Sequence, residues 1–92
     1  MVVTLDEARR YLRVDTTDED ATISTLLQAA QQLCMDVARI SDESEFAAAG
    51  DVARIAVLYA LANLFEARED ADTHDLTLKL RALLFGVRKE TP

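Results

Sequence analysis

Apolar residues recur at helical spacing over most of this 92-residue chain, and the pattern predicts four helices. The first is short. Thr4 followed three residues later by Glu7 is the pattern of a capping box, so a helix is expected to begin there. One face of this helix is apolar, through Leu5, Ala8 and Leu12. It should fade near residues 13–15, where a polar turn begins.

The second predicted helix is the longest and carries a single apolar stripe. Thr17 and Asp20 form a weaker cap pattern, and residues 18–20 place three carboxylates in the first turn, where the helix dipole favours negative charge. The stripe then predicts a helix to about Arg39, and its members are Ile23, Leu26, Leu27, Ala30, Leu33, Cys34 and Val37.

The third predicted helix is apolar on all sides. Between residues 52 and 65 only Arg54 and Asn63 are not apolar. We place the helix at about residues 51–70; residues 46–49 could already be helical, but Gly50 suggests a turn. A helix that is apolar all round must be covered on all sides, and three other short helices can scarcely do that. Part of this surface is therefore expected to meet another chain, and Leu61 is our first choice for an exposed apolar position in that contact.

A fourth helix is expected at about residues 75–85, after a polar loop at residues 70–74, with Gly86 ending it and residues 86–92 forming a flexible tail. The fold class is then all-α: one four-helix domain spanning residues 1–92, with long helices two and three antiparallel and short helices one and four across them. The scarcity of Gly and Pro fits long helices with tight connections. The residues expected to be mostly buried are Leu26, Leu33, Ile55, Tyr59 and Leu83.

Charge and residue content exclude several classes of function. The net charge of −7 argues against a nucleic-acid-binding surface, although residues 76–92 carry four basic side chains and one acidic one. The lone Cys34 cannot form an internal disulfide, and with a single histidine, His74, a structural zinc site cannot be assembled within one chain. The acidic residues 15–20 lack the Gly and Glu that an EF-hand loop requires. We expect no cofactor, no metal and no enzymatic activity.

The N-terminus has no signal-peptide pattern, and the run at residues 52–65 is shorter than the roughly 20 residues that span a bilayer. A soluble protein, intracellular when made, is expected, with no membrane partner.

Two interpretations are open for Tyr59, Phe65 and Arg68. They are either core rings with an arginine paired to a nearby carboxylate, or parts of a subunit contact, where aromatic residues and arginine are enriched. The sequence leaves this choice open.

Five segments in a fixed order resemble the small head–tail connector (adaptor) proteins of long-tailed phages and prophages. Members of this family open with a Leu-Asp-Glu/Asp-Ala helix that ends in Leu-Arg-Val/Ile-Asp, followed by an acidic step and a long helix. A Leu-Tyr-Glu-x-Arg-Glu-like motif and a short Leu-Leu-x-x-x-Arg helix come later. The chain matches at residues 5–8, 12–15, 18–20, 64–69 and 83–88, with Phe65 in place of the usual Tyr.

The resemblance implies a structural virion protein at the head–tail junction, made in the host cytoplasm. It implies a closed homo-oligomeric ring, with about twelve subunits, whose contacts join two different patches of each subunit. Such a ring docks on the portal protein and offers a surface to the next head-completion or tail protein, and DNA only passes through its channel. The basic residues Arg88 and Lys89 could reach an acidic surface of the portal or of the adjacent subunit. The alternative is a small cytosolic helical regulator, such as an antitoxin-like or anti-repressor dimer, which the mass in solution would distinguish.

Overall fold

The computed structural model describes residues 1–66 and 73–86, and these residues form five helices and no strand. The all-α class is confirmed, with one helix more than the four predicted. The helices are α1 (Leu5–Leu12), α2 (Asp20–Ala38), α3 (Glu43–Ala47), α4 (Asp51–Glu66) and α5 (Thr73–Leu83). None of them is both long and apolar enough to cross a membrane.

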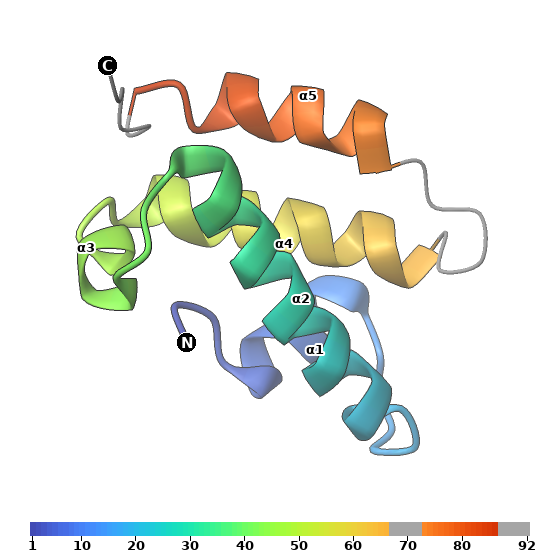
Figure 1. Cartoon of the computed structure of the whole chain (residues 1–92). Coiled ribbons are helices and arrows are strands. Elements are labelled where there is room, and N and C mark those ends of the chain that lie inside the picture. The colour runs from blue at the N-terminus through green and yellow to red at the C-terminus, as the bar shows by residue number, and fades with distance from the viewer. Residues whose placement is uncertain (67–72, 87–92) are drawn as a thin grey trace.

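The two long helices, α2 and α4, form the centre of the domain. They run in roughly opposite directions but cross obliquely instead of lying side by side, with α2 in front of α4 in Figure 1. Helix α5 returns antiparallel along α4 and also contacts α2, whereas α1 packs against α2 and α4 from the other side. The remaining helix, α3, is a short turn between α2 and α4 that contacts α4.

The predicted start and end of α1 are confirmed. The Thr4 side chain accepts a hydrogen bond from the backbone N–H of Glu7 at 3.1 Å, and Arg13 ends the helix in the left-handed conformation, with φ +60°. The Glu7 carboxylate forms an ion pair with Arg54 of α4. Arg9 pairs with Asp6 at 2.6 Å and lies 3.7 Å from Asp20, so ion pairs join α1 to both long helices.

The predicted cap of the second helix is wrong. Helix α2 begins at Asp20, Glu19 is its N-cap without a side-chain hydrogen bond, and residues 18 and 19 lie in the preceding turn. The ion pair of Asp20 with Arg9 gives this end of the helix a partner on α1 instead. The end at Arg39 agrees with the prediction, because Arg39 also adopts the left-handed conformation, with φ +59°.

Helix α3 occupies a segment that the sequence suggested only in part. The Asp42 side chain caps it by accepting from the N–H of Ser44 at 3.0 Å, and its Phe46 ring is fully buried. Gly50 then takes φ +67° and turns the chain into α4, which begins at Asp51 as predicted. Helix α5 begins two residues before its predicted start, and residues 67–72 and 87–92, including most of the expected loop and the tail, lie outside the described residues.

The core corrects the predicted list of buried residues. Ile55 is 56% exposed and Leu83 is 40% exposed, so their prediction as core residues is wrong. Leu26, Leu33 and Tyr59 are only partly buried and pack against the core from its edge. The core itself comes from all five helices and from the segment before α1, and its largest fully buried side chains are Phe46, Ile23, Leu61, Leu80, Leu84, Val3, Val57 and Cys34.

One buried polar side chain ties the N-terminal segment to the helices. The amide of Gln31, on α2, accepts from the N–H of Val2 at 2.9 Å and donates to the Glu43 carboxylate on α3. Glu43 also lies 3.0 Å from the amino group of Met1. The hydrogen bond from Gln31, together with the Met1 ammonium, holds the pKa of Glu43 below its ordinary value. Because a buried amide without partners is costly, this cluster fixes how the first residues lie on α2 and α3.

Candidate subunit interface

A line of apolar side chains on α4 faces away from the core. Val52, Ile55, Tyr59 and Ala62 follow one another at spacings of three and four, which places them on one side of the helix. Val52 is 42% exposed, Ile55 is the most exposed of the four, and the other two are partly buried. In a single chain, the exposed side chains of this face remain in contact with solvent.

Helix α5 extends this line with one more residue. The Lys79 ammonium contacts the Asp75 carboxylate at 3.3 Å, and it also hydrogen-bonds Tyr59, and both interactions raise the pKa of Lys79. The two helices are antiparallel, so one turn beyond Lys79 on α5 corresponds to one turn before Tyr59 on α4. This register pairs position 83 of α5 with position 55 of α4. We call Val52, Ile55, Tyr59, Ala62 and Leu83 the outer stripe.

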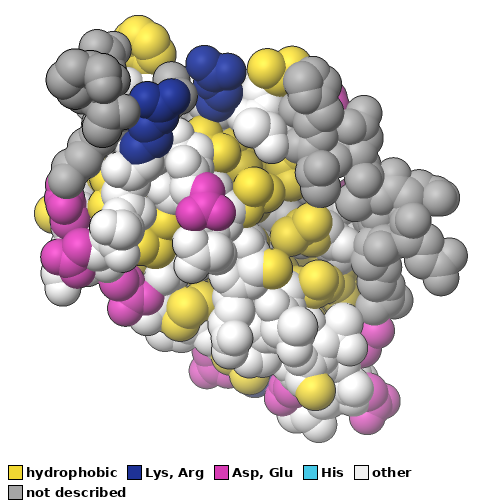
Figure 2. Space-filling model, in the orientation of Figure 1, with side chains coloured by type: hydrophobic (Ala, Val, Ile, Leu, Met, Phe, Trp, Pro, Cys, Tyr) yellow, Lys and Arg dark blue, Asp and Glu magenta, His cyan; other side chains and the backbone are white. Residues whose placement is uncertain are grey.

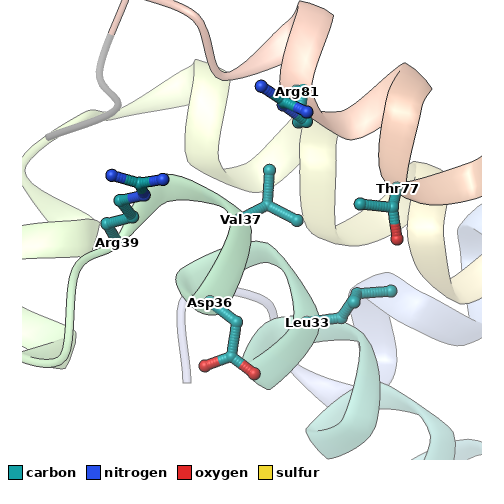
Figure 3. A pocket seen from close by; sticks show the side chains of 6 residues that line it. All are labelled: Leu33, Asp36, Val37, Arg39, Thr77 and Arg81. Carbon is teal, nitrogen blue, oxygen red and sulfur yellow. The ribbon is translucent and has the colours of Figure 1, made fainter. Parts of the chain in front are cut away.

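A shallow hollow lies between α2 and α5, with a volume of about 380 Å³. Figure 3 shows the six side chains that line it: Leu33, Asp36, Val37, Arg39, Thr77 and Arg81. Val37 points up toward α5, where Arg81 lies, and Arg39 lies at the left edge of the hollow (Figure 3). We call these six residues the α2–α5 groove.

Apolar surface continues from the groove along α2. Leu26 lies seven residues before Leu33, so the two share a flank of the helix, and Leu26 lines a second hollow with Ala21, Thr22 and Thr25. Figure 2 shows hydrophobic side chains gathered over the centre of this face, with Lys and Arg at the upper margin and most Asp and Glu at the left and lower edges. The groove is thus the basic end of an extended apolar face.

The outer stripe and the groove lie on opposite sides of α5. Thr77 and Arg81 line the groove, whereas Lys79 and Leu83 accompany the outer stripe. Each pair differs by two residues, which is about 200° around a helix. The subunit therefore carries two unlike surfaces that point away from each other.

Among the described residues, neither a reactive thiol nor a metal-binding cluster accompanies these surfaces. Cys34 is fully buried, and burial raises the pKa of its thiol to about 12, so the thiolate that a nucleophile needs is scarce at neutral pH. Across residues 1–66 and 73–86, no group of three or more His, Cys, Asp or Glu side chains is arranged to hold a metal ion.

The comparison with protein families decides the class of this protein. The family model described as phage gp6-like head-tail connector protein matches residues 2–90. The chain belongs to this family. It is therefore a structural connector protein of a phage and a component of the virion, which agrees with the resemblance drawn from the sequence. No curated protein and no solved structure matches the chain.

The residues proposed from sequence for this connector's contacts meet different outcomes. Leu61 has no exposed surface, so its choice as an exposed contact position is wrong. It lies on the side of α4 that packs into the core. Tyr59 lies in the outer stripe. Phe65 is partly buried and lies six residues from Tyr59, about 120° away around the helix, so the structure does not bring these two rings to one surface. Arg68, Arg88 and Lys89 lie outside the described residues.

The surface positions of this connector that its sequence does not reveal are Val52, Ile55, Leu83 and the groove. Ile55 and Leu83 were assigned to the core because leucine and isoleucine usually lie there. The groove brings together side chains of residues 33–39 and 77–81, which are more than 35 residues apart in the sequence, and a local sequence pattern does not predict such a contact.

Proposed function

We propose that this connector protein forms a closed ring, with about twelve subunits, in which each subunit makes head-to-tail contacts through two different patches. The ring docks on the portal, extends the DNA channel, and presents a surface to the next head-completion or tail protein. Membership in the connector family supports a role at the head–tail connection. The observation that carries the ring is the pair of unlike apolar surfaces on opposite sides of α5.

The apolar residues of the outer stripe support a contact with another protein. Burial of exposed Ile and Leu side chains against another chain lowers the free energy by about 25 cal/mol per Å² of apolar area. Single exposed apolar residues are common on monomers, but the outer stripe gathers three exposed and two partly buried apolar residues on one face, which is a recognisable docking surface. A closed ring covers such a surface on every subunit, whereas a chain on its own leaves it in water.

The experiment that tests this function mixes the purified connector with purified portal of the same phage. Sedimentation velocity and electron microscopy of the mixture are expected to show a ring of connector subunits coaxial with the portal. Bovine serum albumin in place of the portal controls for non-specific association. A connector that stays monomeric both alone and with the portal would overturn the proposal.

A second experiment tests whether the protein is needed to join tails to DNA-filled heads. Disruption of its gene in the phage or prophage should yield heads that have packaged DNA but lack attached tails, and a plasmid copy should restore tailed particles. Tailed, infectious particles in the absence of the gene would contradict a connecting role.

A further inference from the structure

We infer that the outer stripe of one subunit packs into the α2–α5 groove of the next subunit. The inference rests on the proposed ring and specifies which two surfaces meet in it. Three observations support it: the positions of the two surfaces, their shapes and their charges.

The positions suit a head-to-tail contact. A ring requires that each subunit present one surface to the neighbour before it and a different surface to the neighbour after it. The outer stripe and the groove satisfy this condition because α5 separates them, with Lys79 and Leu83 on one side and Thr77 and Arg81 on the other. A contact of stripe with stripe would join two chains and stop there.

The shapes are complementary. The antiparallel register of α4 and α5 pairs Ile55 with Leu83, and both are exposed, so we infer that they form a ridge. The groove is a hollow with Leu33 and Val37 among its lining residues, and the apolar face continues from it to Leu26. A ridge of branched side chains in an apolar hollow is the packing found in the cores of protein interfaces.

Two charges at the margins, one on each surface, make no ion pair among the described residues and are of opposite sign. Glu66 follows Ala62 by four residues, so an exposed carboxylate ends the outer stripe. At the other end Asp51 precedes Val52, but it is paired with Arg54 at 3.2 Å. The groove holds two arginines, Arg39 and Arg81, against one acid, Asp36. Within the part of the chain that the structure describes, neither Glu66 nor Arg81 makes an ion pair. A contact between the two surfaces would bring these charges together, which favours one orientation of the neighbouring subunit.

Single-cysteine variants distinguish this contact from others. Ile55→Cys places a thiol on the outer stripe, and Thr77→Cys places one in the groove. The native Cys34 does not compete, because it is buried and its thiol pKa is raised to about 12. Each variant is treated with a flexible bismaleimide under the conditions in which the unmodified protein assembles, alone, in a 1:1 mixture, and as the double variant.

The expected result is that neither variant cross-links with itself, the mixture gives a covalent dimer, and the double variant gives a ladder that ends at the full ring. A mixture of Ile55→Cys with Gln28→Cys, an exposed position of α2 outside both surfaces, should give no dimer. Circular dichroism of each variant checks that the helices are retained.

Four other outcomes would overturn the inference. A dimer from Ile55→Cys alone means that stripe meets stripe. Equal cross-linking of the Gln28→Cys control means that the contact lies elsewhere. Assembly of the unmodified protein without any cross-link between positions 55 and 77 would leave the proposed ring standing and remove only this pairing. Absence of assembly, alone and with the portal, refutes the ring as well.

Discussion

Ile55 and Leu61 belong to one apolar run on α4 and have opposite environments. Leu61 has no exposed surface, whereas more than half of Ile55 is exposed to solvent. Six residues separate them, so they lie about 120° apart around the helix, one toward the core and one away from it. The hydrophobicity of each residue is similar, and only its direction decides whether it stabilises the subunit or is left for a neighbour.

Shortening these two side chains should therefore have unequal effects on the isolated subunit. Leu61→Ala is expected to lower the free energy of unfolding by about 2–5 kcal/mol, because it opens a cavity in a packed core. Ile55→Ala should cost much less, since most of its side chain already contacts water. Urea unfolding followed by circular dichroism, below the concentration of assembly, measures both values. Equal losses would mean that Ile55 is also a core residue.

At the scale of helices, the sequence predicted where each helix begins and ends better than it predicted which side of the helix is buried. Thr4, Arg39 and Asp51 mark helix boundaries close to the predicted ones, because capping and polar turns act locally. The exposed side of α4 could not be predicted from the sequence. Its two polar residues, Arg54 and Asn63, are nine positions apart, which is two and a half turns, so they lie on opposite sides of the helix.

Each of these polar residues has a partner within the chain, so its position does not indicate which side of α4 is exposed to solvent. Arg54 pairs with Glu7 and lies 3.2 Å from Asp51, and the Asn63 amide donates to the backbone carbonyl of Tyr59 at 2.9 Å. The outer stripe was thus hidden in an all-apolar pattern. Only the packing of α1, α2 and α5 around α4 shows which side is left uncovered.

The turn between α3 and α4 depends on Gly50. Its φ of +67° is unfavourable for residues with a Cβ, although no atom lies within 4 Å of the place that a Cβ would take. Gly50→Ala should lower the unfolding free energy by about 1–2 kcal/mol through backbone strain alone. Gly86→Ala is the matched control, because that glycine also has open space around it but does not have a positive φ. A thermal melt in which both variants lose the same stability would contradict this explanation.

The Gln31–Glu43 cluster should make stability depend on pH. The hydrogen bond from Gln31 and the Met1 ammonium lower the pKa of Glu43 from its ordinary value of 4.5, so the folded state favours the charged carboxylate. The stabilisation is present in full above pH 4.5 and is lost as the pH falls through the lower pKa of the folded state.

Glu43→Gln removes this titration. The variant should melt at a lower temperature than the parent near neutral pH, and the difference should shrink as the pH is lowered below 4.5. Asp18→Asn, which removes an exposed carboxylate in the turn before α2, is the control. A difference between parent and Glu43→Gln that stays constant from pH 7 to the acid range would show that the carboxylate charge is not what stabilises the cluster.

At the scale of the whole molecule, the class of the protein was predictable and the location of its contacts was not. Short motifs in a fixed order identified the connector family, which the family comparison confirms. The expectation that part of the all-apolar helix meets another chain stays a prediction. The structure changes its position from Leu61 to the outer stripe, because tertiary packing buries the first and exposes the second.

A charge on the outer stripe should prevent assembly without unfolding the subunit. Ile55→Glu places a carboxylate where the proposed contact is apolar, and an unpaired charge is costly to remove from water. The variant should keep its helical circular dichroism and sediment as a monomer where the parent forms rings. Gln28→Glu, on an exposed part of α2, should assemble like the parent, and Leu61→Glu should lose its fold. Rings of normal size from Ile55→Glu would exclude the outer stripe from the contact.

The position of α5 between the two surfaces has a geometric consequence for the ring. In the proposed ring the same helix supplies side chains to both contacts, so its tilt on the core contributes to the angle between them and hence to the curvature of the ring. Leu76 and Leu80 of α5, and Leu84 directly after it, are the buried side chains on which this segment rests, so we expect them to fix its tilt. A change in their size would alter how many subunits close a circle, even though none of the three touches a neighbour.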